Sequence, residues 1–377
     1  MNYCTPDYDH CLVNLSNSVL KAFGAKTTAP TLAMADKLLE GSYKNVVVLL
    51  MDAMGISILE KHLNPDGFLR SHLQGQYSSV FPPTTVAATT SVLSGLYPNE
   101  HGWLGWDIYY PELDKNVTVF TNTEQVTEDE NKNIKEIVPA ADYHVGFRYT
   151  PYKNIIEKIN EAGGNAYTSM PFLDPFPQDL DSIFARVVDL CNKPEKKFIY
   201  AYWNEPDQTI HLTGPDSKET HDLMTGLEKK IEDLASKLSD TLLLITADHS
   251  QIACTNYCLM DYPEILKCLV RLPSIEPRTL SFWVKDEYKE SFPEIFRKEF
   301  GDKFWVATRE EVIEQKLFGI GKDHELFEDM LGDYIAISVS DAAIFLTHKE
   351  MESMPGGHAG LTKEEMEIPL IAVIKDE

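Results

Sequence analysis

The stretch VVVLLMD (residues 46–52) consists of six apolar residues, three of them β-branched, followed directly by a carboxylate. Three further short apolar runs, at residues 198–203, 242–246 and 369–374, are each followed within two residues by a polar side chain, and helical patterns lie between them. Such runs are typical of parallel strands that are buried on both faces of a sheet. We therefore predict an α/β fold: a mostly parallel central sheet with helices on both faces.

Polar residues lie within a few positions after several of these runs. Asp52 follows the first, residues 205–207 follow the second, and Asp248 and His249 follow the third. Ligands of open α/β sheets gather beyond the carboxyl ends of the strands. We expect the functional site at this edge of the sheet.

One part of the chain has a different pattern. Strand-like runs at residues 280–284 and 304–307 are followed by Thr308-Arg309-Glu310-Glu311, which is a capping box for a helix. We predict that residues 261–345 form a smaller inserted α+β cap lobe, and that residues 1–260 and 346–377 form the catalytic core. The polar segment 106–145 is expected to form an irregular rim over the same side of the sheet.

The composition limits the partners of the chain. Its 377 residues are 43% hydrophobic and carry a formal net charge of −25, which argues against a nucleic-acid duplex or an anionic membrane as partner. No run is long enough to span a membrane and the N-terminus has no leader pattern, so we expect a cytoplasmic protein. The six cysteines are irregularly spaced, which predicts reduced thiols, and for Cys254 and Cys258 packing is favoured over zinc binding.

A threonine pair opens a segment of small residues, PPTTVAATTSVLSG (residues 82–95). The prolines end the preceding strand, and Thr84 or Thr85 then begins a helix that ends near Gly95. Backbone N–H groups and the helix dipole at this end favour an alkoxide or an incoming phosphate. The alternative for either threonine is a helix N-cap without chemistry.

Several acidic and imidazole side chains have spacings that suit metal binding. Asp207 and His211 are one helical turn apart, although a surface ion pair would explain the same spacing. Asp248 and His249 are adjacent near a strand end, where metal binding is favoured over a pair of solvent-exposed polar side chains without a function. His358 lies in the turn GGHAG (residues 356–360), which an ordinary glycine-rich turn would also explain.

These side chains form a consistent set when they are taken together. With Asp52, which alone could equally cap the next helix, they make three aspartates and three histidines at strand ends or tight turns. That number suffices for two divalent cations with a threonine between them. Oxygen and nitrogen ligands without thiolate suit zinc, with manganese as the alternative.

The order of the motifs and the residues that make up each of them resemble the alkaline phosphatase superfamily, and most closely its type I phosphodiesterase/nucleotide pyrophosphatase branch. The resemblance begins at the strand that ends in Asp52 and runs from residue 45 nearly to the C-terminus. Its further motifs are PPTT leading into GLYPNEHG, then EPDQTIHLTGP, TADHS, and GGHAG before EEMEIPLI.

The resemblance implies a site and an activity. One metal ion would be surrounded by Asp52, Thr85, Asp248 and His249, and the other would be held by the set Asp207, His211 and His358. Thr85 aligns with the family nucleophile when residues are counted back from Gly95, with Thr84 as the neighbouring alternative. The implied activity is hydrolysis of phosphodiester or pyrophosphate bonds in a small, nucleotide-like phosphoester through a covalent phospho-threonine.

The sequence departs from the family at one position. Family members that hydrolyse nucleotide diesters typically carry an asparagine where this chain has Trp106. Its indole N–H could donate to phosphate or its ring could stack on a base, but we expect Trp103 and Trp106 to serve packing.

Other activities therefore stay open. A phosphomonoesterase or phosphonate hydrolase would need a basic residue near the substrate, which the lobe could supply from Lys285, Arg309 or Lys322. No basic residue lies beside the motifs, which favours a singly charged diester. Transfer to an acceptor other than water is a further alternative, as is a non-catalytic metal-binding homologue. A sulfatase is unlike this chain because Thr85-Val86-Ala87-Ala88 lacks its nucleophile motif.

Overall fold

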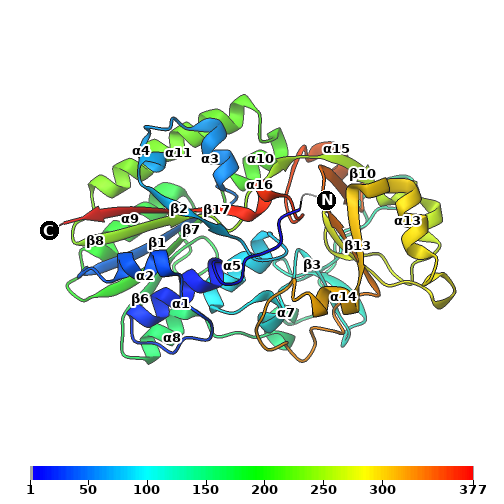
Figure 1. Cartoon of the computed structure of the whole chain (residues 1–377), viewed down its shortest axis with the longest axis horizontal. Helices are drawn as coiled ribbons and strands as arrows, with labels where there is room; N and C mark the ends of the chain where they lie inside the picture. The colour runs from blue at the N-terminus through cyan, green and yellow to red at the C-terminus, as the bar shows by residue number, and fades with distance from the viewer. Residues whose placement is uncertain (1–2, 377) are drawn as a thin grey trace.

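A six-stranded sheet forms the centre of the protein in a computed structural model that describes residues 3–376 (Figure 1). Its strands lie in the order β2-β17-β8-β1-β7-β6. Their bounds are β1 (Asn45–Met51), β2 (Leu73–Ser78), β6 (Ala166–Ser169), β7 (Lys197–Trp203), β8 (Thr241–Thr246) and β17 (Glu367–Lys375). Every residue of β1 and β8 is buried, because the sheet is covered on both faces.

The expected parallel arrangement holds for most of this sheet. Strand β1 pairs in parallel with both β7 and β8, and β6 pairs in parallel with β7. Strand β17, however, runs antiparallel to β8 and to β2, so the prediction of a parallel strand at residues 369–374 was wrong. An apolar run records burial on both faces and carries no information about strand direction.

Helices cover both faces of the central sheet, as predicted. In Figure 1, α3 (Ile56–His62) and α11 (Lys218–Ser236) lie above the sheet, and α1 (Leu12–Ala22) and α8 (Ile155–Glu161) lie below it. The helix α5 (Thr85–Ser94) packs on α1 and points toward the second half of the molecule. None of the helices among residues 3–376 is both long and apolar enough to cross a bilayer.

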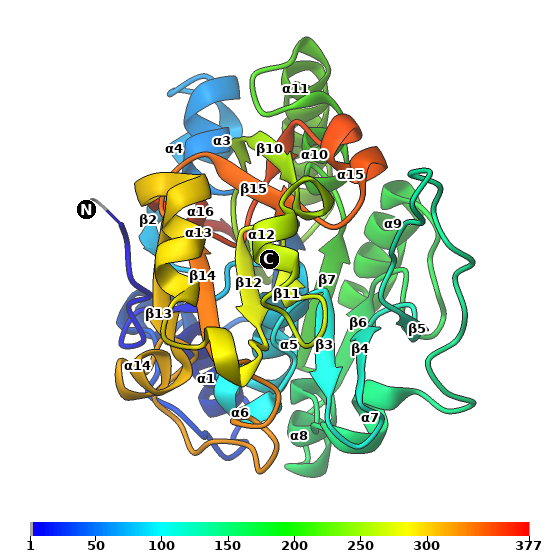
Figure 2. The same cartoon turned by 90° about the vertical axis from the view of Figure 1, so that its right-hand side faces the viewer.

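A second, seven-stranded sheet lies at the other end of the molecule, facing the viewer in Figure 2. It is antiparallel throughout, in the order β13-β14-β12-β11-β3-β4-β5. The strand bounds are β3 (Asp107–Tyr110), β4 (Lys115–Thr118), β5 (Thr123–Glu124), β11 (Ser274–Glu276), β12 (Thr279–Phe282), β13 (Phe304–Thr308) and β14 (Tyr334–Ser338).

The second sheet corrects one prediction and confirms another. Residues 107–124 contribute three of its strands, so the description of 106–145 as an irregular rim was wrong for this part. These strands are short and rich in polar residues, which hides their periodicity. The strand-like runs near residues 280 and 304 are strands, and Thr308 caps α14 (Arg309–Glu314) through the predicted capping box.

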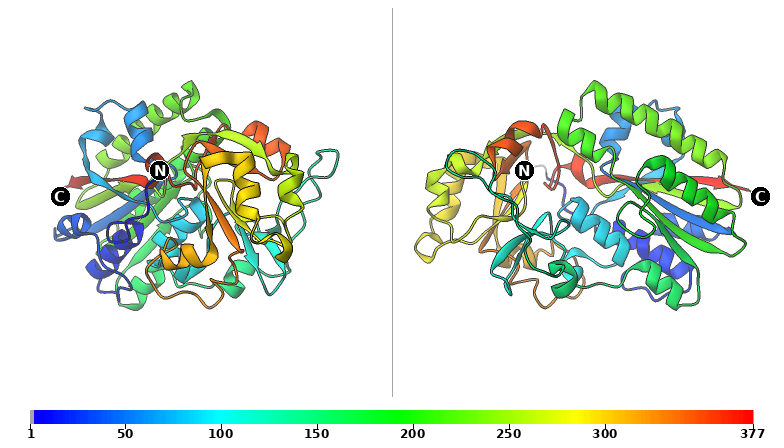
Figure 3. Two further views of the ribbon diagram at one scale, coloured as in Figure 1. Left: turned by 45° about the vertical axis from the view of Figure 1, so that its right-hand side comes forward. Right: turned by 180° about the vertical axis from the view of Figure 1, so that it is seen from behind.

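The division into a core and an inserted lobe at residues 261–345 stays a prediction. The second sheet takes strands both from that range and from residues 107–124, and the two views of Figure 3 show these segments together beside the central sheet. The remaining elements are α2 (Ala33–Leu39), α4 (Phe68–Ser71), α6 (Pro98–His101), α7 (Val145–Tyr149), α9 (Leu180–Cys191), α10 (Asp207–Thr213), β9 (Ile252–Ala253), β10 (Thr255–Cys258), η1 (Leu259–Asp261), α12 (Pro263–Leu266), η2 (Asp286–Tyr288), α13 (Phe292–Phe300), η3 (Gly301–Lys303), β15 (Ala342–Phe345), α15 (His348–Ser353), β16 (Gly356–Gly357) and α16 (Lys363–Met366).

Candidate active site

Asp52 lies at the carboxyl end of β1, between the ends of β7 and β8. Its side chain is buried, with a relative exposure of 1%. The hydroxyl of Tyr202, on the neighbouring strand β7, donates a hydrogen bond of 2.5 Å to Oδ2 of Asp52. The parallel register of the two strands thus fixes the orientation of this carboxylate.

Thr85 is the first residue of α5, and Thr84 is its N-cap residue with an extended backbone. Oγ1 of Thr85 lies 3.3 Å from Oδ2 of Asp52 and 3.2 Å from Nε2 of His249. The hydroxyl of Thr84 points elsewhere and donates to Oε1 of Glu276 at 2.6 Å. Of the two threonines, therefore, only Thr85 has its hydroxyl among the candidate metal ligands.

Asp248 and His249 follow β8 and complete this half of the site. Oδ1 of Asp248 accepts hydrogen bonds from the backbone N–H groups of Ala53 and His249, at 3.1 and 3.0 Å. Oδ2 of Asp248 is buried and has no hydrogen-bond partner within the described part of the chain. It lies 3.6 Å from Nε2 of His249, which is itself 3.4 Å from Oδ1 of Asp52.

The other half of the site is built on α10 and the turn at residues 356–360. Oδ1 of Asp207 lies 3.5 Å from Nε2 of His211 and 3.8 Å from Nε2 of His358. Nδ1 of His211 lies 3.0 Å from the carbonyl oxygen of Gly356, and Nδ1 of His358 lies 3.1 Å from that of Pro83. A proton on each Nδ1 would satisfy these carbonyls and leave each Nε2 free as a ligand.

The electrostatics of the site reflect crowded negative charge. Burial, together with the charges of Asp248 and Asp207, raises the pKa of Asp52 well above its usual value. Burial also raises the pKa of Asp248. Burial and the neighbouring imidazoles of His249 and His211 lower the pKa of His358, which keeps its ring neutral. A divalent cation bound among these side chains would neutralise the clustered carboxylates.

The donor set therefore fits metal ions. In each of two groups, single ligand atoms lie within 4.8 Å of one another: the first group is Asp52, Asp207 and His249, and the second is Asp207, His211 and His358. The buried, unpartnered Oδ2 of Asp248 lies beside the first group. All donors are oxygen or nitrogen, which suits zinc or manganese. Asp207 belongs to both groups, whereas the resemblance assigns it to one metal alone.

All seven predicted ligand positions come together at one edge of the central sheet, although they come from five separate segments of the chain. Sequence reasoning missed two side chains that orient them. Tyr202 binds Asp52, and the side-chain amide of Gln251 donates to Oδ1 of Asp207 at 2.5 Å. Each lies within two residues of a strand end or a predicted ligand, a position that could have drawn attention to it.

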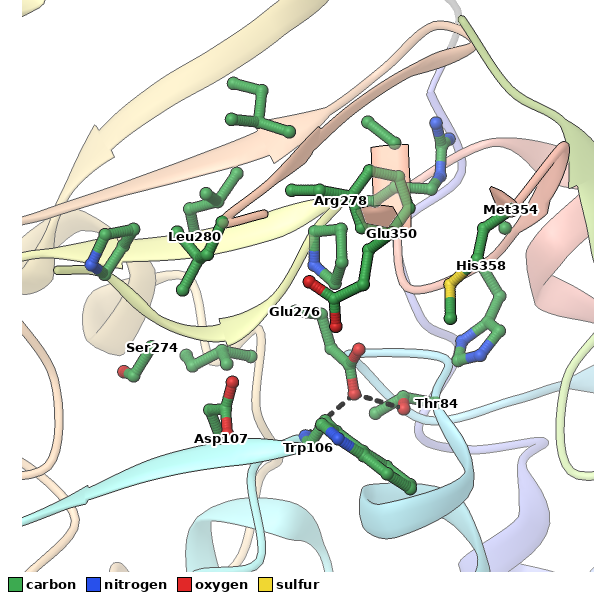
Figure 4. A pocket seen from close by; sticks show the side chains of 18 of the residues that line it. Thr84, Trp106, Asp107, Ser274, Glu276, Arg278, Leu280, Glu350, Met354 and His358 are labelled. Carbon is green, nitrogen blue, oxygen red and sulfur yellow. Dashed lines mark hydrogen bonds between the residues drawn. The ribbon is translucent and has the colours of Figure 1, made fainter. Parts of the chain in front are cut away.

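A cavity of about 240 Å³ opens beside Thr85, Asp207 and His358, between the ligand edge and the second sheet (Figure 4). Its lining includes Trp106, Asp107, Glu276, Arg278, Glu350 and Met354. Burial raises the pKa of Glu276 to about 8. No motif in the sequence pointed to Glu276, because it lies within residues 261–345, where none of the recognised motifs falls.

The two tryptophans differ. Trp103 is 2% exposed, and its indole N–H donates to the carbonyl oxygen of Thr150 at 2.8 Å, as expected for packing. Trp106 is 44% exposed and lines the cavity, so burial in a core does not account for it.

A third cluster lies outside this site. Cys258 lies within 4.8 Å of ligand atoms of Glu128 and His348. Both ring nitrogens of His348 face carboxylates, with Nδ1 2.6 Å from Glu128 and Nε2 3.2 Å from Asp261, and this arrangement is an ion-pair network. All six cysteines are free, and Cys258 lies in strand β10.

A mostly parallel sheet with clustered carboxylates and imidazoles at its carboxyl edge, and a threonine at the start of a facing helix, defines a protein of the alkaline phosphatase superfamily. The model of the family described as type I phosphodiesterase/nucleotide pyrophosphatase matches residues 46–359. The chain therefore belongs to this family of hydrolases.

Among curated proteins, the chain is similar to human ectonucleotide pyrophosphatase/phosphodiesterase family member 5, with 24% identity over 204 residues. That match covers 51% of this chain and 41% of the human protein, so the similar region spans less than half of the relative.

Solved structures share the fold. The human ectonucleotide pyrophosphatase/phosphodiesterase 5 structure has a TM-score of 0.66 at 17% identity, covering 88% of this chain and 87% of that one. An inactive murine form in complex with AMP has a TM-score of 0.62 at 15% identity, covering 88% and 91%. Phosphonoacetate hydrolase from Sinorhizobium meliloti, in complex with phosphonoformate, has a TM-score of 0.60 at 14% identity, covering 89% and 91%.

Proposed function

We propose that this protein is a metal-dependent hydrolase that cleaves phosphodiester or pyrophosphate bonds of a small phosphoester, with Thr85 as nucleophile. The observation that carries this proposal is the position of Oγ1 of Thr85, 3.3 Å from Asp52 and 3.2 Å from His249 at the start of α5. Thr84, not Thr85, is the N-cap residue of α5, so helix capping does not account for the position of the Thr85 hydroxyl among these ligand atoms.

The proposed ligands are those that the resemblance implies. Asp52, Thr85, Asp248 and His249 would hold one cation, and the set Asp207, His211 and His358 would hold the other. We propose zinc for both, with manganese as the alternative. When bound, such ions lower the pKa of a coordinated hydroxyl and neutralise charge at phosphorus.

The chain's own residues orient the reaction. Tyr202 holds the Asp52 carboxylate, which lies within reach of the Thr85 hydroxyl proton. Attack by Oγ1 on phosphorus forms the Oγ1–P bond and expels the leaving oxygen, giving a phospho-threonine. Water then attacks phosphorus, the Oγ1–P bond breaks, and the hydroxyl of Thr85 is restored with one proton. The murine relative in complex with AMP supports a small phosphoester as substrate.

A phosphomonoesterase or phosphonate hydrolase is the second candidate, supported by the shared fold of phosphonoacetate hydrolase. A doubly charged monoester calls for additional positive charge. Among the described residues that line the cavity, the basic side chains are His211, Arg278 and His358, and the guanidinium of Arg278 is paired with Glu365. Because the guanidinium in this lining is already paired, the cavity favours a singly charged diester over a doubly charged monoester.

The test is hydrolysis of bis-p-nitrophenyl phosphate, p-nitrophenyl phosphate and phosphonoacetate by protein reconstituted with zinc or manganese, with and without a chelator. We expect chelator-sensitive preference for the diester. Preference for the monoester or the phosphonate would select the second candidate. Bound metal without turnover of any of these substrates would leave a non-catalytic homologue.

A further inference from the structure

Three buried side chains from separate segments of the chain meet at a second place, outside the candidate active site. Glu128 comes from the irregular segment that follows β5, Cys258 ends β10, and His348 is the first residue of α15. Their exposures are 8%, 1% and 7% respectively. One ligand atom of each lies within 4.8 Å of the others. The fold therefore gathers a carboxylate, a thiol and an imidazole in one buried cluster.

The thiol and the carboxylate face the same nitrogen of the imidazole. Nδ1 of His348 lies 2.6 Å from Oε1 of Glu128 and 3.5 Å from Sγ of Cys258. The other oxygen of Glu128, Oε2, accepts the backbone N–H of His348 at 2.8 Å, and this hydrogen bond orients Oε1 toward the ring. An oxygen, a sulfur and a nitrogen donor thus lie together in the cluster.

The second ring nitrogen of His348 has a carboxylate of its own. Nε2 lies 3.2 Å from Oδ1 of Asp261, whose side chain is 56% exposed. A histidine that binds a metal through one nitrogen commonly donates the other N–H to a carboxylate, which fixes the tautomer and the orientation of the ring. Asp261 has the position of such a supporting carboxylate, and its exposure places the buried donors close to solvent, the source of an entering ion.

We propose that Glu128, Cys258 and His348 form a structural zinc site, separate from the candidate active site, with Asp261 supporting His348 through Nε2. Thiolate, imidazole and carboxylate are the side-chain ligands that zinc takes, and water completes its four-coordinate shell. The thiolate disfavours calcium and magnesium, which take oxygen ligands. The spacing of Cys258 from Cys254 favoured packing because the other ligands lie far away in the sequence, at residues 128 and 348.

The charges of the cluster are compatible with this exchange of ligands. Without a cation, a proton on each nitrogen of His348 satisfies the carboxylates of Glu128 and Asp261. Zinc would replace the proton on Nδ1 and the proton of the Cys258 thiol. Two protons leave as one divalent cation enters, so the total charge of the cluster is unchanged.

The site would fasten one wall of the cavity beside the candidate active site. Between β5 and α7 the described chain forms no helix or strand, and Glu128 lies in this segment. Gln125 and Val126 of the same segment line the cavity, and so do Glu350 and Met354 at α15. Helix α15 packs against β10 (Figure 2). A metal bound by Glu128 would therefore fix the irregular segment against two regular elements.

The test uses cobalt(II) as a spectroscopic substitute for zinc in the full chain. Cobalt bound to a thiolate gives a charge-transfer band in the near ultraviolet, and the proposed catalytic ligands contain no sulfur. We expect this band when metal-stripped wild type is titrated with cobalt, its disappearance when zinc is added, and its loss in Cys258→Ser. The matched control is Cys254→Ser, which removes a neighbouring thiol outside the cluster and should keep the full band.

A second variant measures the support of His348. Asp261→Asn keeps an acceptor oxygen but removes the charge, and the fold should tolerate it because the side chain is exposed. Its cobalt affinity, followed by the same band, should be about 10–100-fold weaker, as for the loss of an outer partner of a metal-binding histidine. Elemental analysis of zinc-reconstituted protein should also find less zinc per chain in Cys258→Ser than in Cys254→Ser.

A wild-type spectrum without the band at saturating cobalt would overturn the proposal, even if Cys258→Ser failed to fold. A band of equal size in Cys258→Ser, or its loss in Cys254→Ser, would place the thiolate elsewhere and overturn it as well. Phosphodiester turnover is measured separately. An inactive protein that shows the band would lose the proposed function and keep this site, whereas an active protein without the band would lose this site alone.

Discussion

The hydroxyl oxygen of Thr85 lies 3.2 Å from Nε2 of His249, although the two residues are 164 positions apart in the chain. The contact joins the start of α5 to the end of β8 and places a hydroxyl where carboxylates and imidazoles converge.

Replacing Thr85 by Ala should reduce turnover of the preferred diester by roughly a thousandfold or more, because the nucleophilic oxygen is lost. Metal content should stay near the wild-type value, since the carboxylates and imidazoles remain. Rapid-quench mass spectrometry should detect a covalent adduct on Thr85 in the wild type and none in the variant. Full activity in Thr85→Ala, or an adduct on Thr84, would overturn the assignment of the nucleophile.

Replacing Asp248 or His358 by Ala should remove metal as well as activity. Each substitution deletes a proposed ligand, and even loss of a side chain that only orients a ligand weakens metal binding by about 10–100-fold. Elemental analysis of the dialysed proteins measures the effect directly, with Thr85→Ala as the inactive control that keeps its metal. Wild-type metal content in Asp248→Ala would show that its unpartnered Oδ2 is not a ligand.

Stabilisation by metal should grow with pH. The pKa values of Asp52 and Asp248 are raised in the cation-free fold, so these groups bind protons more tightly when folded than when unfolded. Their contribution to stability is therefore present at low pH and is lost as the pH rises above the unfolded value of about 4 toward the raised folded values. A bound cation replaces those protons, and the gain in Tm on adding zinc or manganese should be larger at pH 8 than at pH 5. A gain independent of pH would contradict this account.

The buried pair of Arg278 and Glu365 should be a major support of the turn that carries His358. Both side chains are at most 1% exposed, and Oε1 of Glu365 also accepts from the backbone N–H of Gly360 at 2.8 Å. Replacing Arg278 by Met leaves a buried carboxylate unpaired, so urea denaturation should show a loss of about 3–5 kcal/mol in the free energy of unfolding.

The exposed pair of Lys153 and Glu161 offers the comparison. Lys153→Met should leave the free energy of unfolding nearly unchanged, because solvent screens the pair. An equal effect of the two substitutions would show that burial does not set the strength of the Arg278 pair.

The sequence determined the parts of the protein that are local in the chain. Apolar runs predicted the buried strands, because a strand that is buried on both faces consists almost entirely of apolar residues. Asp52, Asp248 and His249 could be named because each lies within three residues of the carboxyl end of such a strand, and the capping box at Thr308 predicted the start of α14. The family resemblance added Thr85 and the second ligand set, since its motifs are short and ordered along the chain.

Tertiary structure alone decided what depends on contacts between distant segments. The antiparallel direction of β17 and the strands within residues 107–124 follow from pairing partners, which local patterns do not encode. The hydrogen bonds of Tyr202 to Asp52 and of Thr84 to Glu276 join residues 150 and 192 positions apart. Such contacts exist only once the chain has folded, because hydrogen-bond partners are set by proximity in space, and they determine both the orientation of the candidate ligands and the charge of the cavity beside them.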